Sequence, residues 1–160
     1  MKIQFIIAFG FISSLCKAQI IVIEENEIAA ILTAHNKERS VLNIPDLEWS
    51  KQLAKESEKW ALNLALDDNG LYHSNNDDYG ENIALFYSNP PHFGVELWNE
   101  EKVDFRYGKS NVFEKVGHYT QVIWKNTTQV GCGCARGKSK AFYFVCKYNP
   151  PGNYIGVKPY

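Results

Sequence analysis

Hydrophobic residues recur at helical spacing in three segments of the chain. The first two segments cover residues 24–42 and 51–66, and the third begins at Pro90-Pro91. The residues at helical spacing are Ile28, Ile31, Leu32, His35 and Leu42 in the first segment and Leu53, Ala54, Ser57, Trp60, Ala61 and Leu64 in the second. The third segment has apolar residues at Phe93, Val95, Leu97 and Trp98. This pattern predicts three amphipathic helices that pack against a common core.

Two runs near the C-terminal end are typical of β-strands instead. Residues 130–135 and 141–148 are rich in apolar and aromatic side chains, and residues 137–140 between them contain glycine and short polar residues. We therefore predict an antiparallel hairpin with a turn at 137–140. Residues 102–115 are polar and show no periodicity, so we expect a mobile connecting loop there.

The densest chemistry in the chain lies in residues 117–124. His118 is titratable, Thr120 and Gln121 offer hydrogen bonds, and the three residues that follow, ending at Trp124, favour burial. We interpret this stretch as a rigid wall that holds His118 at the edge of a cavity. The alternative is a core segment with one hydrogen-bonded histidine, because a single histidine rarely defines a site.

The N-terminal segment is typical of a secretory signal peptide. A lysine precedes an apolar run over residues 3–15, and small residues stand at the -3 and -1 positions of a cut between Ala18 and Gln19. We therefore predict a signal peptide over residues 1–18 and a single domain over residues 19–160. The secreted protein would have no transmembrane span.

Two other interpretations of this segment stay open. An uncleaved anchor would join the apolar run to residues 20–23, although Lys17 and Gln19 interrupt it. Lipid modification of Cys16 would need a small residue before the cysteine, and the chain has Leu15 there. Either interpretation would leave the protein attached to a membrane.

Composition and charge narrow the class of protein. The 160 residues are 45% hydrophobic and 22% charged, which is usual for one soluble domain with a sizeable core. The chain has 17 basic and 18 acidic residues, and removing residues 1–18 takes away two lysines and no acid, which leaves 15 and 18. No concentrated basic patch is present, so we expect no nucleic-acid partner.

Three motifs of the chain resemble the CAP superfamily, which comprises the cysteine-rich secretory proteins, antigen 5 and the pathogenesis-related 1 proteins. Two long motifs cover residues 117–127 and 143–154. The second fits at every constrained position except Lys147, where asparagine is usual. The shorter third motif is His73-Ser74, followed by Gly80-Glu81-Asn82-Ile83. The resemblance extends over nearly all of the chain after the signal peptide.

This resemblance implies an α+β fold, the three-layer α-β-α sandwich of the superfamily, and a site in a central cavity. The implied site residues are His73, Glu81, Glu101 and His118, with Glu100 as the alternative to Glu101. Imidazole nitrogens and carboxylate oxygens suit Zn²⁺ or another divalent cation, and the carboxylates can also orient the imidazoles. The spacing of the four residues forms no compact metal motif, so only the fold can bring them together.

The same residues allow two other interpretations. The two histidines and two glutamates could form a buried polar network that stabilises the domain without a ligand. A hydrolase could use Ser74 or a metal-bound water as nucleophile, but the chain contains no nucleophile elbow and no His-Glu-x-x-His motif. We therefore expect no catalytic residue. We expect a structural role for His35, on a packed helix.

Three cysteines remain after removal of the signal peptide. Cys132 and Cys134 face the same side of one strand, so either could pair with Cys146 across the hairpin, and the register decides. Relatives often bond the cysteine that matches Cys132 to another loop, so the resemblance favours a disulfide between Cys134 and Cys146. A metal site made by the three thiols is the alternative.

The function that the resemblance implies is that of a secreted, non-catalytic binding protein, expected to be a monomer. It would bind a divalent cation in the His/Glu cavity, and a sterol, fatty acid or other lipid in an apolar groove. The alternatives are a secreted hydrolase, an extracellular interaction scaffold, and the precursor of a signalling peptide. The peptide would be cut between Asn149 and Pro150, because the C-terminal tail resembles that of plant pathogenesis-related 1 proteins.

Overall fold

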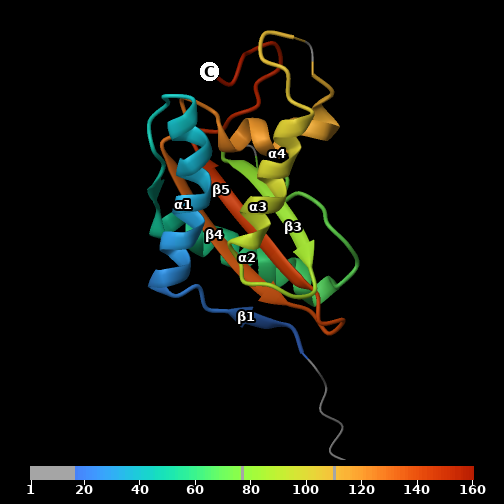
Figure 1. Ribbon diagram of the computed structural model, residues 1–160. Helices are drawn as coiled ribbons and strands as arrows, with labels where there is room; N and C mark the ends of the chain where they lie inside the picture. The colour runs from blue at the N-terminus through green and yellow to red at the C-terminus, as the bar shows by residue number, and fades with distance from the viewer. Residues whose placement is uncertain (1–16, 77, 110) are drawn as a thin grey trace, which may run out of the picture.

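A computed structural model describes residues 17–76, 78–109 and 111–160 of the chain. Its helices and strands follow one another in the order β1 (Gln19–Ile21), α1 (Glu25–Val41), β2 (Glu48–Trp49), α2 (Lys51–Asp67), β3 (Gly80–Phe86), α3 (Phe93–Glu100), the 3-10 helix η1 (Glu101–Val103), α4 (Phe113–Val122), β4 (Gln129–Arg136) and β5 (Phe142–Asn149). Figure 1 shows the long strands crossing the centre of the molecule, with helices in front of them and behind.

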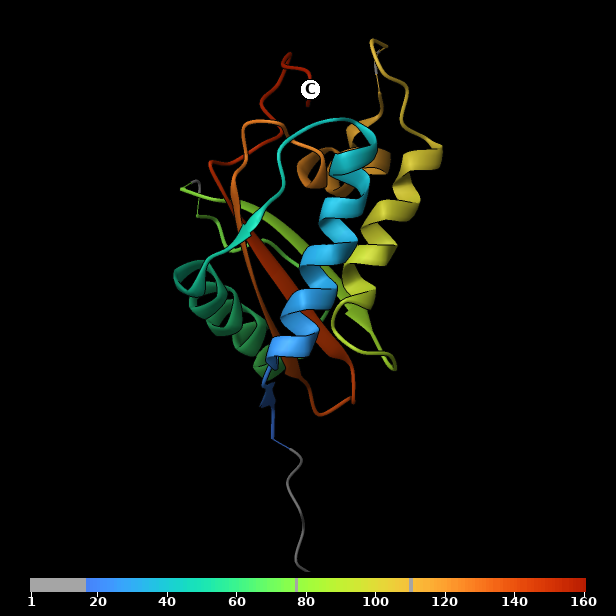
Figure 2. The ribbon, with the colours of Figure 1, turned by 60° about the vertical axis from the view of Figure 1, so that its left-hand side comes forward.

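The strands form one sheet in the order β1-β4-β5-β3, and the short β2 pairs with β4. The pairs of β4 with β1, of β4 with β5 and of β5 with β3 are antiparallel, whereas β2 runs parallel to β4. Helix α2 covers one face of this sheet, and α1, α3 and α4 cover the other, which Figure 2 shows from the side. The predicted α+β three-layer sandwich is confirmed.

Most of the predicted elements are present at nearly the predicted positions. Helices α1 and α2 and the hairpin of β4 and β5 each begin and end within about two residues of the predicted bounds. Helix α4 was not predicted as a helix: residues 113–115, assigned to the polar loop, form its first turn, and His118 lies within it. Strand β3 was also missed.

Two glycines set the distance between α2 and the sheet. A Cβ atom on Gly131 would lie 2.2 Å from the backbone nitrogen of Ala54, and one on Gly133 would lie 2.1 Å from that of Glu58. No side chain fits there, so the backbone of α2 packs directly on β4. Because side chains alternate along a strand, the intervening Cys132 and the next cysteine point to the opposite face, toward α1 and α3.

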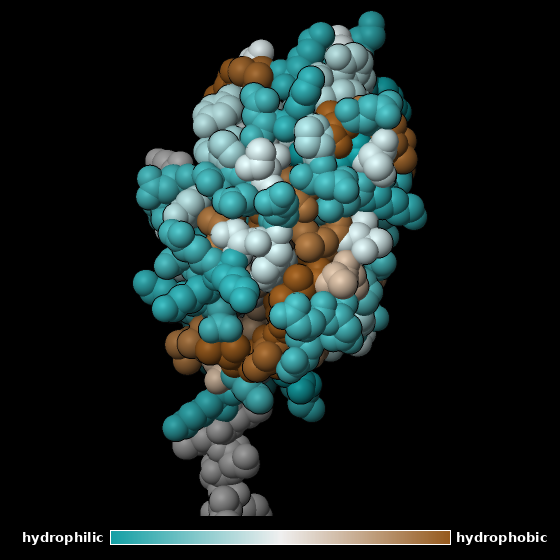
Figure 3. Space-filling model, turned by 90° about the vertical axis from the view of Figure 1, so that its left-hand side faces the viewer, coloured by the Kyte–Doolittle hydropathy of each residue, from teal (hydrophilic) through white to brown (hydrophobic). Residues whose placement is uncertain are grey.

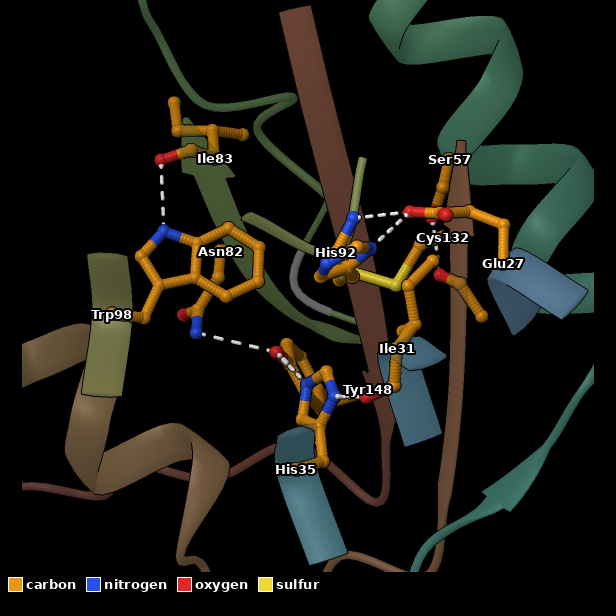
Figure 4. The surroundings of a disulfide bond; sticks show 12 residues. Glu27, Ile31, His35, Ser57, Asn82, Ile83, His92, Trp98, Cys132 and Tyr148 are labelled. Atoms are coloured by element: carbon orange, nitrogen blue, oxygen red, sulfur yellow. Dashed lines mark hydrogen bonds and ion pairs between the residues drawn. A yellow bond between two sulfur atoms is a disulfide. The ribbon is translucent and has the colours of Figure 1, made fainter. Parts of the chain in front are cut away.

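The predicted disulfide between Cys134 and Cys146 is wrong. In the register of the hairpin, Cys132 lies directly opposite Cys146, and Cys134 lies opposite Phe144. The disulfide accordingly joins Cys132 to Cys146, whose Cα atoms are 4.1 Å apart (Figure 4). Cys134 stays a free, buried thiol, and burial raises its pKa to about 12. With two sulfurs in the disulfide, the three-thiol metal site does not form.

The predicted signal peptide falls almost entirely on residues 1–16, which lie outside the described residues, as does Cys16. Strand β1 begins at Gln19, directly after the predicted cut. None of the helices in the described part of the chain has the length and apolar character needed to cross a membrane. The cleavage position stays a prediction.

Candidate functional site

Two of the four predicted site residues, Glu101 and His118, form a pair between η1 and α4. The imidazole Nδ1 of His118 lies 2.6 Å from Oε1 of Glu101, and Oε2 of the same carboxylate accepts the backbone N–H groups of His118 and Tyr119 at 3.0 Å. The imidazole ring also stacks on Trp98, with ring centroids 6.0 Å apart. Glu101, rather than Glu100, is therefore the partner of His118: three hydrogen bonds hold its carboxylate, and one of them orients the ring.

The other two predicted site residues, His73 and Glu81, form a second pair, which also contacts the ammonium of Lys147. Nδ1 of His73 lies 2.8 Å from Oε1 of Glu81, and Nζ of Lys147 lies 2.9 Å from Oε2. Lys147 is only 3% exposed. Burial by itself would raise the pKa of Glu81, but hydrogen bonds from His73, Lys147 and Ser74 outweigh it and lower the pKa to about 2. The carboxylate therefore stays ionised, and the buried ammonium of Lys147 balances its charge.

The Ser74 hydroxyl belongs to the same network and has no histidine partner there. Its Oγ accepts a hydrogen bond from Nζ of Lys147 at 2.9 Å, and its backbone N–H donates to Glu81 at 3.0 Å. The ammonium of Lys147 only donates hydrogen bonds. The serine therefore lacks the adjacent base that a nucleophile requires.

The two pairs lie near each other but do not merge. Asn82, next to Glu81 in β3, donates from Nδ2 to the carbonyl of His118 at 3.0 Å. Within the described ranges, no hydrogen bond or ion pair joins one pair to the other. Those ranges also contain no group of three His, Cys, Asp or Glu side chains that could hold a metal ion.

His35 lies on a packed helix, as expected, and one of its two partners is Tyr148 of β5. The buried imidazole donates from Nδ1 to the carbonyl of Ile31 at 2.8 Å and accepts at Nε2 from the hydroxyl of Tyr148 at 2.9 Å. Asn82 in turn donates to that hydroxyl at 3.3 Å. Figure 4 shows His35, Tyr148 and Asn82 in the core, near the disulfide. Both ring nitrogens are satisfied, so His35 has no free position for a ligand.

A cavity of about 840 Å³ lies elsewhere, between two segments that are far apart in the sequence. Its walls come from the loop before α4 and the start of α4 on one side, and from residues 153–159 of the C-terminal tail on the other. Its main apolar lining residues are Phe105, Phe113, Val116, Trp124, Tyr154 and Val157. None of the four predicted site residues lines it. Sequence reasoning expected an apolar groove but did not locate it: Thr120, Trp124, Asn153 and Tyr154 lie in the two long motifs, yet nothing in the sequence shows that these segments enclose a common space.

The tail that forms one wall is fastened to the body of the domain. Asn153 donates from Nδ2 to the carbonyl of Gly117 at 2.8 Å and accepts from Thr120 at 2.7 Å. The backbone N–H of Lys125 donates to the carbonyl of Pro159 at 2.7 Å. The tail therefore forms part of the folded domain, and its release by a cut after Asn149 stays a prediction.

Comparison with known proteins supports the resemblance seen in the motifs. The profile of the cysteine-rich secretory protein family (CAP) matches residues 32–148. The basic form of pathogenesis-related protein 1 from Nicotiana tabacum is 34% identical over 138 residues, which are 85% of this chain and 77% of that protein. The secreted protein RBT4 of Candida albicans is 37% identical over 81% of this chain and 36% of its own length. The description of RBT4 as secreted agrees with the predicted extracellular location.

Solved structures show the same fold. The structure described as NaASP2 with Zn²⁺ superimposes with a TM-score of 0.72 at 23% identity, over 86% of each chain. The hookworm platelet inhibitor also has a TM-score of 0.72, at 20% identity, over 92% of this chain and 81% of that one. At this level of identity the likeness concerns the arrangement of the backbone.

Proposed function

Because the chain belongs to the cysteine-rich secretory protein (CAP) family, we propose that it is a non-catalytic extracellular protein that binds an apolar ligand of the sterol or fatty-acid class. The observation that supports this proposal is the cavity of about 840 Å³ between the loop before α4 and the C-terminal tail. Its size falls within the range of roughly 300–1,000 Å³ that is usual for small-molecule sites.

The threonine and asparagine side chains in the cavity wall are already bonded within the protein. Thr120 and Asn153 are bonded to each other, and Asn111 accepts from the backbone N–H of Arg106 and donates to the carbonyls of Arg106 and Lys109. A polar ligand would find few free partners, whereas an apolar ligand would displace water from hydrophobic walls.

Two lysines distinguish between the candidate ligands. Lys109 and Lys158 both line the cavity and are exposed, so their ammonium groups can meet a negatively charged head group at its edge. A fatty acid carries one carboxylate at the end of an apolar chain. The two lysines can meet the carboxylate, and the apolar walls can contact the chain. We therefore favour a fatty acid over a sterol.

Replacing Phe113 with alanine tests this site. The ring lines the cavity and is 59% exposed, so its loss removes apolar ligand contact at little cost to folding. We expect the affinity for a fluorescent long-chain fatty acid to fall about tenfold, the effect of losing part of a buried phenyl group. Fluorescence titration measures this loss.

Tyr87→Ala is the matched control, because this aromatic side chain is 65% exposed and lies outside the cavity wall. The control should bind as the wild type does. An absence of saturable binding in the wild type, or an equal loss in both variants, would overturn the proposed function.

A second candidate function, binding of a divalent cation, rests on the two imidazoles. Each presents Nδ1 to a carboxylate, an arrangement that fixes the tautomer and leaves Nε2 available as a metal ligand. The residues fit a cation held by His73 or His118 together with water, rather than a closed site of four protein ligands. Bound there, Zn²⁺ would supply a fixed positive charge with open coordination positions. The related NaASP2 structure is described with Zn²⁺.

Calorimetric titration with Zn²⁺ tests the cation site. We expect binding in the wild type and its loss when His73→Ala and His118→Ala are combined, with native circular dichroism. The two single variants identify which imidazole holds the cation. In the wild type, Lys147 is bonded to the Glu81 carboxylate at 2.9 Å. Lys147→Asn removes this ammonium, so the carboxylate can attract a cation held by His73, and we expect the affinity to rise about tenfold. A wild type that binds no Zn²⁺ would leave the two pairs as a structural network.

A further inference from the structure

Six large hydrophobic side chains are exposed at one end of the molecule. We call this surface the tip: it comprises residues 105–109, residues 111–113 and residues 153–158. Its exposed apolar side chains are Tyr107, Val112, Phe113, Tyr154, Ile155 and Val157, six of the fourteen large hydrophobic side chains exposed in the described part of the chain. Ile155 is fully exposed, at 103% of its reference area. Such a concentration on one surface indicates an interaction site.

The two segments of the tip form a single surface. The ring of Tyr107 stacks on that of Tyr160, with centroids 4.8 Å apart, and Nζ of Lys158 lies 5.4 Å from the centroid of Tyr107. Figures 1 and 2 both place the C-terminal tail and the loop before α4 at the same end of the molecule, opposite β1. In Figure 3, hydrophobic side chains emerge among hydrophilic ones at this end.

The charge of this region is opposite to that of the rest of the protein. The tip carries three basic side chains, Arg106, Lys109 and Lys158, and no acidic one, whereas residues 19–160 as a whole carry 15 basic and 18 acidic ones. The tip is therefore the positive end of a negative molecule. Such a distribution orients the protein toward a negatively charged surface.

We propose that the tip docks onto the surface of an anionic lipid membrane. The exposed aliphatic side chains would enter the boundary between head groups and acyl chains, the tyrosines would lie at the level of the head groups, and Lys109 and Lys158 would meet the lipid phosphates. Exposed apolar side chains next to cations combine the two interactions that hold a protein at an anionic lipid surface, apolar insertion and electrostatic attraction. This docking does not depend on a ligand in the cavity.

Sedimentation with lipid vesicles tests the docking. We expect the secreted form of the protein to bind vesicles of phosphatidylcholine with phosphatidylserine, to bind vesicles of pure phosphatidylcholine far less, and to dissociate as salt rises. Ile155→Ser should weaken binding about tenfold through the loss of apolar contact. Lys109→Gln combined with Lys158→Gln should weaken it roughly 25-fold, since each cation near an anionic surface contributes about fivefold.

Matched controls come from α2, on the opposite side of the sheet. Leu66 is 61% exposed and Lys59 is exposed, so Leu66→Ser and Lys59→Gln change the same chemistry away from the tip and should bind as the wild type does. An absence of binding to anionic vesicles, or equal losses in the controls, would overturn the proposal. A dimer in solution that Ile155→Ser dissociates would also overturn it, by assigning the tip to self-association.

The vesicle experiment is separate from the test of the cavity. Val112 belongs to the tip but is not among the residues that line the cavity, so Val112→Ser should weaken vesicle binding and leave fatty-acid affinity unchanged. Vesicle binding without fatty-acid binding would support docking and refute the proposed function. The reverse result would support the proposed function and refute docking.

Discussion

Replacing Arg39 with methionine is expected to lower the free energy of unfolding by about 4 kcal/mol. The guanidinium is fully buried and donates to four backbone carbonyls, those of Pro45, Val122, Trp124 and Thr127, at 2.6 to 2.9 Å. Each buried acceptor that loses its donor costs about 1–3 kcal/mol. Some of these carbonyls keep other partners, because Trp124 also accepts from the backbone N–H of Thr127, so the sum lies below the maximum.

The large effect follows from what Arg39 connects. Its side chain leaves α1 and bonds the end of α4 and the turn that leads into β4, the stretch that contains the first family motif. These four carbonyls lie at the end of α4 and in loops, and the guanidinium supplies the hydrogen bonds that a helix or sheet would otherwise provide. Its planar fork of donors suits this role, and Arg39→Lys should recover only part of the loss.

Urea unfolding followed by tryptophan fluorescence measures the change. Arg136→Met serves as the matched control, since Arg136 is partly exposed and makes one long hydrogen bond of 3.4 Å to a carbonyl. We expect its effect to stay below about 1 kcal/mol. A similar, small effect in both variants would contradict the structural role assigned to Arg39.

Acidification is expected to remove about 3 kcal/mol of stability between pH 6.5 and 4 through His35 alone. Burial lowers the pKa of His35 from 6.5 to about 4, and the charge of Arg39 adds to this effect, whereas the hydrogen bond to the Ile31 carbonyl opposes it. The unfolded state therefore binds a proton before the folded state does. The contribution of neutral His35 to the free energy of unfolding is therefore present above pH 6.5 and is lost as the pH falls toward 4. Its size follows from the difference between the two pKa values, at about 1.4 kcal/mol per pH unit.

Unfolding experiments across this pH range test the linkage. His35→Gln should show a flatter dependence of stability on pH between 6.5 and 4, even if it is less stable than the wild type at neutral pH. His92→Gln, which changes a partly exposed histidine bonded to Glu27 at 2.9 Å, should keep the drop. A wild type whose stability stays constant over this range would contradict the buried neutral His35.

The sequence predicted those elements whose periodicity is regular and long. Helices α1 and α2 and the hairpin of β4 and β5 have such patterns, and the family motifs supplied the three-layer arrangement. Helix α4 was not predicted because it has only ten residues, contains Gly117 and follows a polar loop. Its apolar residues therefore form too short a pattern to indicate a helix. The register of the hairpin decides which cysteine meets Cys146, and alternation of side chains alone leaves two possibilities.

The two parts of the candidate site were predictable to different degrees. The four residues followed from the family resemblance, but which glutamate meets which histidine came only from the structure. Lys147 was visible only as a departure from the usual asparagine, and its bond to Glu81 requires the pairing of β3 with β5. The cavity depends on contact between the loop before α4 and the C-terminal tail. No pattern in either segment indicates that the other packs against it.

The measurement that tests the central claim most directly is a titration of isotope-labelled protein with a long-chain fatty acid, followed by two-dimensional amide NMR spectra. The account predicts saturable shifts concentrated on the residues that line the cavity, such as Phe105, Val116 and Tyr154, with α2 unaffected. Saturable shifts centred on another part of the fold would contradict the assigned site. The absence of any saturable shift would contradict the binding function itself.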